Sequence, residues 1–238
     1  PNYANYDITN SLFTGNKIFD CKGNGNNVFV WGGAENYSSE RGELTGTMIE
    51  DNEIYGSHRS GIEIAGSADD LTIKNNKIYG NSGLPTDDPN KLKYGNGIVV
   101  IRMGSDKTSP TGEGPDNLTI EDNEIYGNEK NGIYMGPVNS NHTLSGNVIR
   151  DNGRDGIRID LDEQYHGGSV PAYDRTSNIV ATNNSIHDNN LGAQVLGTPT
   201  NGFVLDASGN WWGISTPAGV AAEVSANVDY TPWLDSGT

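Results

Sequence analysis

An asparagine-centred repeat of about 24 residues runs through most of the chain and leaves few folds open to it. The octapeptide Ile-Glu-Asp-Asn-Glu-Ile-Tyr-Gly occurs at 49–56 and again, unchanged, at 120–127, with a near-copy at 73–81. When the chain is aligned on this asparagine, the pattern recurs at spacings of 24 to 47 residues. The aligned positions are Asn16, Asn52, Asn76, Asn123, Asn147, Asn184 and Asn210.

Three short apolar segments accompany each asparagine and predict three strands per repeat. One precedes the asparagine, one follows it at once, and a Gly-Ile-x-Ile type of segment comes later, as at 61–64 and 156–159. Apolar residues alternate within each segment, as in strands with one buried face. No segment has a hairpin partner in its own repeat, so each strand must pair in parallel with the equivalent strand of the next repeat. We therefore expect an all-β solenoid of about seven coils and three parallel sheets.

The quoted repeats resemble those of right-handed parallel β-helix proteins, a superfamily of pectate-lyase-like, carbohydrate-active and surface proteins. The resemblance rests on the segments at 71–81 and 96–100 and covers nearly the whole chain. The C-terminal sequence, with Ser-Gly-Asn-Trp-Trp-Gly at 208–213, looks like the closing segment of many bacterial members. The resemblance implies a right-handed parallel β-helix, and we expect a single domain over 1–238 with a closing segment at about 205–238.

Charge and composition exclude some classes of partner. The formal net charge of −16 disfavours nucleic acids and anionic membranes. No apolar run is long enough to span a membrane, and the single cysteine, Cys21, forms no internal disulfide. The chain starts at Pro1 inside a patterned segment, which predicts a mature or trimmed piece of a longer protein. With the resemblance, these features predict a secreted or cell-surface bacterial protein without an organic cofactor; the oligomeric state stays open.

The aligned asparagines are interpreted as a structural ladder. Each sits where a sharp turn needs a residue that tolerates left-handed geometry, and stacked amides can hydrogen-bond to one another. The residues after them alternate in charge along the stack, so opposite charges face each other. These residues are Lys17, Glu53, Lys77 and Glu124.

An aromatic column follows three positions after the asparagines. It contains Phe19, Tyr55, Tyr79 and Tyr126 and is continued by Arg150 and His187. The column is either a stabilising cross-strand stack or a platform for sugar rings.

Long insertions flank the Gly-Ile-x-Ile sheet, at 31–43, 82–95, 102–117 and 160–178. In the resembled superfamily this sheet and its loops form the polysaccharide groove. The outward residues on it are predicted to be Phe29, Glu63, Val99, Tyr134, Arg158 and Gln194, one per coil.

Tyr134 and Arg158 should lie about 5 Å apart on neighbouring strands. An arginine that neutralises a uronate carboxylate, with Tyr134 and His166 as acid and base, supplies the parts for removing the proton alpha to that carboxylate. The alternative is that Arg158 pairs with Asp155 or with a glutamate such as Glu63 on a solvated face. Candidate substrate-binding residues are Glu63, Arg59, Lys130, Asp155, Tyr165 and Tyr94.

An acidic loop segment supplies candidate metal ligands. Asp160, Asp162 and Glu163 offer the carboxylate oxygens that Ca²⁺ prefers, although acidic loops are often only solvated. Asp87 and Asp88 form a second, weaker candidate, and no His/Cys spacing typical of zinc occurs.

The sequence thus predicts an extracellular β-helix protein that acts on or binds a polysaccharide or cell-surface glycan, as a uronate lyase or epimerase if it is an enzyme. Hydrolysis fits less well, because Glu63 and Asp160 lie three coils, roughly 14 Å, apart, whereas an inverting pair needs about 6.5–9.5 Å. The alternative is a non-catalytic surface, adhesin or spike module that uses the β-helix as a rigid glycan-binding scaffold.

Overall fold

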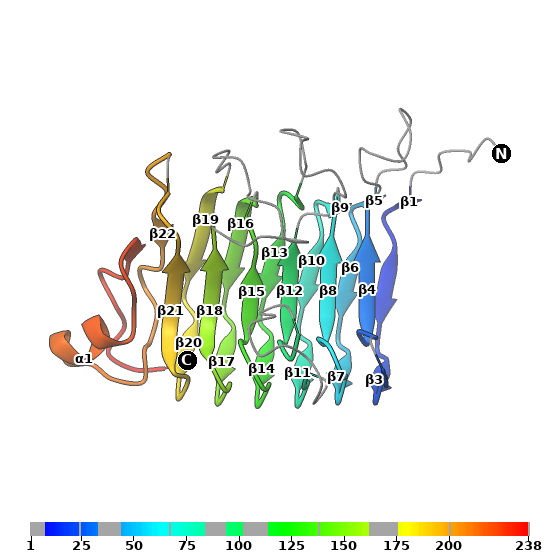
Figure 1. Ribbon diagram of the computed structural model, residues 1–238, viewed down its shortest axis with the longest axis horizontal. Coiled ribbons are helices and arrows are strands. Elements are labelled where there is room, and N and C mark those ends of the chain that lie inside the picture. Colours follow the sequence, from blue (N-terminus) through cyan, green and yellow to red (C-terminus); the bar gives the residue numbers. More distant parts are fainter. Residues whose placement is uncertain are drawn as a thin grey trace.

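The computed structural model describes residues 8–23, 25–32, 44–66, 68–83, 94–101, 114–137, 139–161, 176–199 and 201–237. Its strands wind into a parallel β-helix whose coils stack along one axis (Figure 1). Every pairing between named strands is parallel and joins equivalent segments of neighbouring coils, such as Ile73 with Ile49 and Ile120. The predicted all-β solenoid is confirmed.

Three long sheets and one short sheet make up the walls. The eight-stranded sheet contains β2 (Leu12–Thr14), β6 (Met48–Glu50), β10 (Thr72–Lys74), β13 (Thr119–Glu121), β16 (Ser140–Ser145), β19 (Ser177–Thr182), β22 (Leu205–Asp206) and β23 (Val228–Asp229). The tyrosine sheet contains β3 (Lys17–Phe19), β7 (Glu53–Tyr55), β11 (Lys77–Tyr79), β14 (Glu124–Tyr126), β17 (Val148–Arg150) and β20 (Ser185–His187).

The front sheet, which faces the viewer in Figure 1, contains β4 (Val28–Trp31), β8 (Ile62–Ala65), β12 (Ile98–Ile101), β15 (Ile133–Met135), β18 (Asp155–Asp160) and β21 (Leu191–Leu196). A short sheet of β1 (Ile8–Thr9), β5 (Leu44–Thr45) and β9 (Ala68–Asp69) lies at the N-terminal end.

A continuous apolar core runs along the axis of the helix. Ile54, Ile78 and Ile125 occupy the same register on neighbouring strands and are fully buried, as are Ile62 and Ile98 on the front sheet. Burying one such side chain contributes about 1.5–3 kcal/mol. Because the same position is apolar in every coil, adding a coil extends the core without changing its cross-section.

The predicted asparagine ladder is confirmed along its whole length. Each asparagine donates from its side-chain amide to Oδ1 of the next one, over six links of 2.9–3.0 Å from Asn16 to Asn210. The prediction that these asparagines occupy the left-handed turn position is wrong. Positive φ belongs to the residue just before each, for example Asp51 at 55° and Asn75 at 53°. This preceding residue makes the bend, and the asparagine is then free to turn its amide inward.

A second amide ladder, which the sequence reading missed, lies at the corner between the tyrosine sheet and the front sheet. Its side chains donate in turn over 2.8, 2.9 and 3.0 Å. Here too a left-handed residue precedes each of the four members, for example Gly80 and Asp151. The members are Asn81, Asn128, Asn152 and Asn189.

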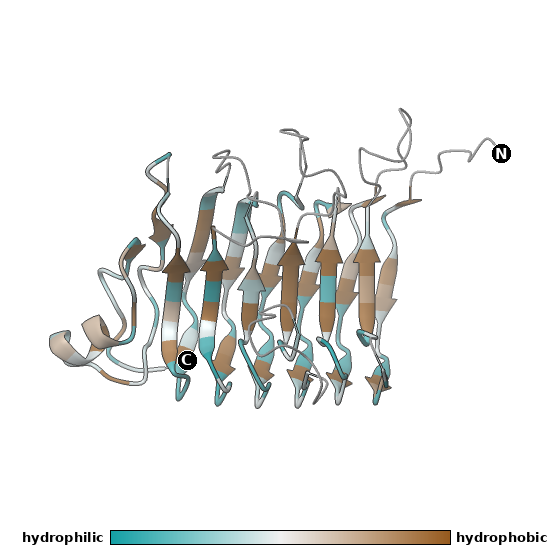
Figure 2. Cartoon of the chain, in the orientation of Figure 1, coloured by the Kyte–Doolittle hydropathy of each residue, from teal (hydrophilic) through white to brown (hydrophobic). Residues whose placement is uncertain are grey.

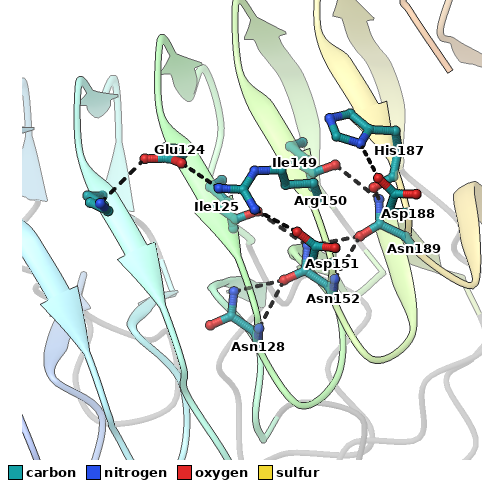
Figure 3. A network of polar contacts seen from close by, with 11 residues as sticks. Glu124, Ile125, Asn128, Ile149, Arg150, Asp151, Asn152, His187, Asp188 and Asn189 are labelled. Carbon is teal, nitrogen blue, oxygen red and sulfur yellow. Dashed lines mark hydrogen bonds and ion pairs between the residues drawn. The ribbon is translucent and has the colours of Figure 1, made fainter. Parts of the chain in front are cut away.

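The outer face of the tyrosine sheet carries the predicted alternation of charge. Lys17 lies 2.9 Å from Glu53, and Glu124 lies 3.8 Å from Lys77 and 2.8 Å from Arg150. Arg150 also pairs with Asp151 at 2.6 Å (Figure 3). Each cation on this face is therefore matched by a carboxylate from its own or a neighbouring coil.

The aromatic column is a stack of parallel rings. Centroids of successive rings from Phe19 to Tyr126 lie 5.3, 4.8 and 5.0 Å apart with interplanar angles of 8–9°. The guanidinium of Arg150 covers the last ring at 4.5 Å. Both faces of Tyr55 and of Tyr79 are thus covered by neighbouring rings, which favours the stabilising role because a sugar needs an open ring face.

The two ends of the helix differ. At the C-terminal end, α1 (Pro217–Ala222) and the chain after it pack on the last coils and bury Trp212, Val220 and Val228 (Figure 1). At the N-terminal end, large apolar side chains of the first coil are exposed. They include Ile8, Leu12, Phe19, Phe29 and Trp31. Figure 2 shows the hydropathy of the strands along the chain. No helix among the described residues is long and apolar enough to cross a membrane.

Candidate functional site

The predicted outward row of the front sheet is confirmed in its register. Glu63 pairs with Phe29 and Val99, Tyr134 with Val99 and Arg158, and Arg158 with Gln194. One side chain per coil therefore lines the outer face, and Tyr134 and Arg158 are neighbours as expected.

The middle of this row is buried rather than open to solvent. Glu63 is 2% exposed, Val99 and Tyr134 are 0% exposed, and Arg158 is 7% exposed. Val99, Ile101, Ala65 and Tyr134 form a small apolar cluster separate from the main core. β12 is therefore buried on both faces, as its unbroken Ile-Val-Val-Ile sequence allows. The side chains in the middle of the outward row are therefore covered in this structure.

Arg158 is held by two neighbours on one side of its guanidinium. Its Nη1 donates to Oδ2 of Asp155 at 2.8 Å and to Oε1 of Gln194 at 2.6 Å. Its Nε is buried and has no hydrogen-bond partner within the part of the chain that the structure describes. The pairing with Asp155 is confirmed, but it lies in a buried place and not on a solvated face.

Asp155 belongs to a row of polar residues that directly precede the front-sheet glycines. In this row, Ser60 donates from its backbone N–H to Asn26, Asn131 donates from its side chain to Asn96 at 2.8 Å, and Asp155 donates from its backbone to Asn131 at 3.2 Å. Asp155 is 1% exposed, and its carboxylate accepts from Arg158.

Three predicted substrate-binding residues lie close together in the coil of β8 and in the next coil along the chain. They are Arg59, Glu63 and Tyr94. Nη2 of Arg59 lies 3.8 Å from Oε2 of Glu63, which also accepts from Asn26 at 2.6 Å. The Arg59 guanidinium lies over the ring of Tyr94 at 4.5 Å. Glu63 is thus matched by a cation and an amide, which stabilise its buried charge.

A basic column runs beside the outward row. Backbone hydrogen bonds join Gly95 to Arg59, Lys130 to Gly95 and Arg154 to Lys130, so these residues are equivalent positions of successive coils. Each lies four residues before a member of the outward row. Arg154 was missed in the sequence reading, which grouped Asp155 with Arg59 and Lys130. The signal was present, since Arg59, Lys130 and Arg154 all stand two positions before a glycine.

Most of the remaining predicted site residues lie outside the part of the chain that the structure describes. His166, Tyr165, Asp162 and Glu163 lie outside the described residues, as do Asp87 and Asp88. Asp160 is 6% exposed at the end of β18. Within the described ranges, no group of three or more His, Cys, Asp or Glu side chains is placed to hold a metal ion.

Stacked amide ladders, parallel coils and three walls of strands define a parallel β-helix protein. A family profile described as "Right handed beta helix region" matches residues 3–211. The chain belongs to this family.

Three solved structures share the fold. The A-modules of two Azotobacter vinelandii mannuronan C-5 epimerases, AlgE6 and AlgE4, are 20% and 18% identical with TM-scores of 0.55 and 0.57. They cover 98% of this chain, which spans 50% and 53% of theirs. The Agl-KA catalytic domain is 16% identical with a TM-score of 0.51 and covers 88% of the chain, which spans 35% of it. The chain thus spans about half, or less, of the length of these neighbours. No curated protein sequence matches it significantly.

Proposed function

We propose that the protein binds a uronate-containing polysaccharide over the outer face of the front sheet and acts on it by removing the proton alpha to the carboxylate, as a lyase or an epimerase. The observation that carries the proposal is the state of Arg158. Its Nη1 is taken by Asp155 and Gln194, while its buried Nε has no acceptor among the described residues. A carboxylate bound at the Nε side would satisfy this donor in a charge-assisted hydrogen bond.

The surroundings of Arg158 suit the binding of a substrate carboxylate. Asp155 and Gln194 fix the guanidinium, so little ordering is left to do when a carboxylate binds. Neutralising the carboxylate makes the neighbouring C–H more acidic, and Tyr134, on the adjacent strand, supplies a phenol for proton transfer. Two solved structures with this fold are mannuronan C-5 epimerases by name, which supports a uronate substrate.

Three further parts belong to the proposal. His166 takes part in proton transfer, and Tyr165 takes part in substrate binding. Asp160, with Asp162 and Glu163, binds Ca²⁺, since carboxylate oxygens are the ligands that Ca²⁺ prefers. A protein that acts on such polymers is secreted or carried on the cell surface.

The burial of Tyr134 means that the proposed reaction requires the outward row to be uncovered first. Tyr134 has no exposed surface, so its hydroxyl meets substrate only after the contacts that cover it have opened. Substrate binding and uncovering of the outward row are therefore coupled, and turnover should depend on chain length of the substrate because remote contacts supply the binding energy for opening.

A second candidate is a non-catalytic glycan-binding module, and one observation favours it. Phe29 and Trp31 lie on the outer face of the front sheet at its N-terminal end and are 51% and 48% exposed. Exposed aromatic rings bind sugars without any chemistry.

The experiment compares wild-type protein with Tyr134→Phe, Arg158→Gln and Trp31→Ala on a panel of uronate polymers, with and without calcium. Ultraviolet absorbance of unsaturated ends detects a lyase, and proton NMR of the polymer detects an epimerase. The proposal expects turnover that falls at least about 100-fold in Tyr134→Phe, the size of a general acid–base contribution. Polymer binding that is lost only in Trp31→Ala, with no turnover in any protein, establishes the non-catalytic module.

A further inference from the structure

Gln194 follows Arg158 in the outward row and lies at one open end of that row. Its side chain is half-buried, whereas Arg158 is 7% exposed and Tyr134 is 0% exposed. The row is therefore covered in its middle and reaches solvent at Gln194. A sugar chain that approaches Arg158 from this end of the front sheet passes over the Gln194 side chain.

The direction of the Gln194 amide is set by its neighbour. Nη1 of Arg158 donates to Oε1 of Gln194 at 2.6 Å. A guanidinium has donors and no acceptor, so the amide oxygen must face Arg158 and the NH₂ group must face away from it. The usual ambiguity between the oxygen and the nitrogen of a glutamine amide is thus removed by the chemistry of its partner.

The NH₂ group of Gln194 is not used by the protein. Nε2 makes no hydrogen bond within the part of the chain that the structure describes. β21 is the last strand of the front sheet, and the chain that packs on it is joined to it by a bridge from Ala193 to Val224. The hydroxyl of Ser225, the next residue there, is engaged with the backbone of Val195 and Ala226. Gln194 therefore presents two N–H donors of fixed direction at the surface.

The spacing of Gln194 and Arg158 matches that of sugars in a chain. The two residues pair in register on neighbouring strands. Such strands lie about 4.8 Å apart, close to the length of one sugar unit in an extended polysaccharide. Gln194 lies on the Nη1 side of Arg158, whereas the proposed carboxylate binds on the Nε side. The two contacts do not compete, and the amide meets the neighbouring sugar.

We propose that Gln194 is a substrate-binding residue that donates from Nε2 to a ring or hydroxyl oxygen of the sugar next to the uronate held by Arg158. This inference rests on the proposed function. The contact is with the neutral part of the carbohydrate, so it adds affinity that does not depend on charge. Because Arg158 already holds the amide in place, little side-chain freedom is lost on binding.

The test measures the Kd of the whole chain for a uronate polymer by calorimetry. Gln194→Met keeps the length of the side chain and removes both polar groups. Gln194→Glu keeps an oxygen that accepts from Arg158 and removes the donor. Asn178→Asp is the matched control, since it changes an exposed amide of β19, on the eight-stranded sheet, to a carboxylate, and aspartate tolerates the positive φ of this position. Thermal unfolding confirms that each variant is folded.

Kd should rise by at least about threefold in Gln194→Met and in Gln194→Glu, as expected for one lost hydrogen bond. Asn178→Asp should bind like wild type. The loss in Gln194→Glu is the sharper result, because this variant keeps the acceptor that holds Arg158. A normal Kd in Gln194→Glu means that only the acceptor of Gln194 matters and overturns the contact.

A double-mutant cycle with Arg158→Gln separates a contact with the sugar from an effect through Arg158. If Gln194 binds the sugar itself, Gln194→Met should weaken binding about three- to tenfold in the Arg158→Gln background as well. No further loss in that background means that Gln194 acts only by positioning Arg158, which also overturns the contact.

The contact and the proposed function fail in different ways. If Tyr134→Phe loses turnover while both Gln194 variants bind normally, the function stands and the contact falls. If wild-type protein binds the polymer without turnover and Gln194→Met weakens this binding in both backgrounds, the contact stands and the chemistry falls. If wild-type protein binds no uronate polymer, both fall together.

Discussion

Arg158 donates to the carboxylate of Asp155 at 2.8 Å, and the two side chains are only 9% and 2% exposed. Asp155 occupies a row in which the equivalent residues, Ser60, Asn96 and Asn131, are uncharged. Asp155 is therefore the negatively charged member of this polar row. It pairs with Arg158, the arginine of the outward row. The pair fixes the guanidinium on which the proposed chemistry depends.

Removing the carboxylate alone should be costly. Asp155→Asn keeps the shape of the side chain and matches Asn131 in the row, but it leaves the Arg158 charge buried without its counter-ion. We expect the free energy of unfolding to fall by about 3 kcal/mol, as for other broken buried pairs. Urea denaturation measures it.

The double variant Asp155→Asn with Arg158→Gln is the control. It removes both charges and should recover part of the loss. A single variant as stable as wild type would show that Arg158 does not depend on Asp155.

The asparagine ladder predicts a large effect from one buried amide. Asn123 donates to the carbonyls of Ile73 and Glu121 and to Asn147, and it accepts from the backbone and the side chain of Asn76. Asn123→Ala leaves several of these buried groups without partners, each costing about 1–3 kcal/mol. We expect at least about 3 kcal/mol of lost stability.

The control for the ladder is Ser208→Ala, which removes an exposed hydroxyl that donates to Asp206 at 2.8 Å. It should change the urea midpoint little, because both groups can bond to water. Equal effects at the two positions would mean that the ladder is not a main source of stability.

Much of this architecture follows from the sequence because the repeat fixes register. Once Asn52, Asn76 and Asn123 are aligned, the pairing of Ile54, Ile78 and Ile125 and the neighbourhood of Tyr134 and Arg158 are determined. The left-handed position was assigned one residue too late, since asparagine suits both a tight turn and an amide ladder, and composition does not separate the two roles.

The burial of the outward row was harder to foresee. Alternation was taken to mean one buried and one solvated face, but Ile98, Val99, Val100 and Ile101 are apolar on both faces, as in a strand buried on both sides. Periodicity within the repeats predicts the strands and their register, and it contains no information on what covers their outer face. Arg154 was missed for a simpler reason: Asp155, next to it, is the more familiar binding residue.

A buried histidine makes stability depend on pH. His142 is 1% exposed, its Nδ1 accepts from the backbone N–H of Leu118 at 3.2 Å, and burial lowers its pKa to about 4. The unfolded chain, with an ordinary pKa near 6.5, binds this proton more readily than the folded protein does. Stability should therefore fall as the pH drops from about 6.5 to about 4, by up to about 3 kcal/mol from this residue.

The variant His142→Gln isolates this effect. Its amide oxygen can accept from Leu118, but it does not titrate, so the difference in unfolding free energy between wild type and variant should change across this pH range. Carboxylates act in both proteins and cancel. A constant difference would show that His142 is accommodated in its charged form.

The aromatic column should matter for stability and not for glycan binding. Tyr79 stacks between Tyr55 and Tyr126, and its hydroxyl donates to Glu53 at 2.7 Å. This hydrogen bond to a carboxylate, together with burial, raises the pKa of Tyr79. Tyr79→Ala removes two ring contacts, each contributing about 0.5–1.5 kcal/mol, so the melting temperature should fall by several degrees.

Trp31→Ala is the matched comparison for the column, since it removes an exposed ring from the front sheet. Calorimetry of both variants with the same uronate polymer separates the two faces of the protein. Tyr79→Ala should bind like wild type, because its ring faces are already covered by its neighbours in the stack. Loss of binding in Tyr79→Ala at a temperature where it is fully folded would move the glycan site to the tyrosine sheet.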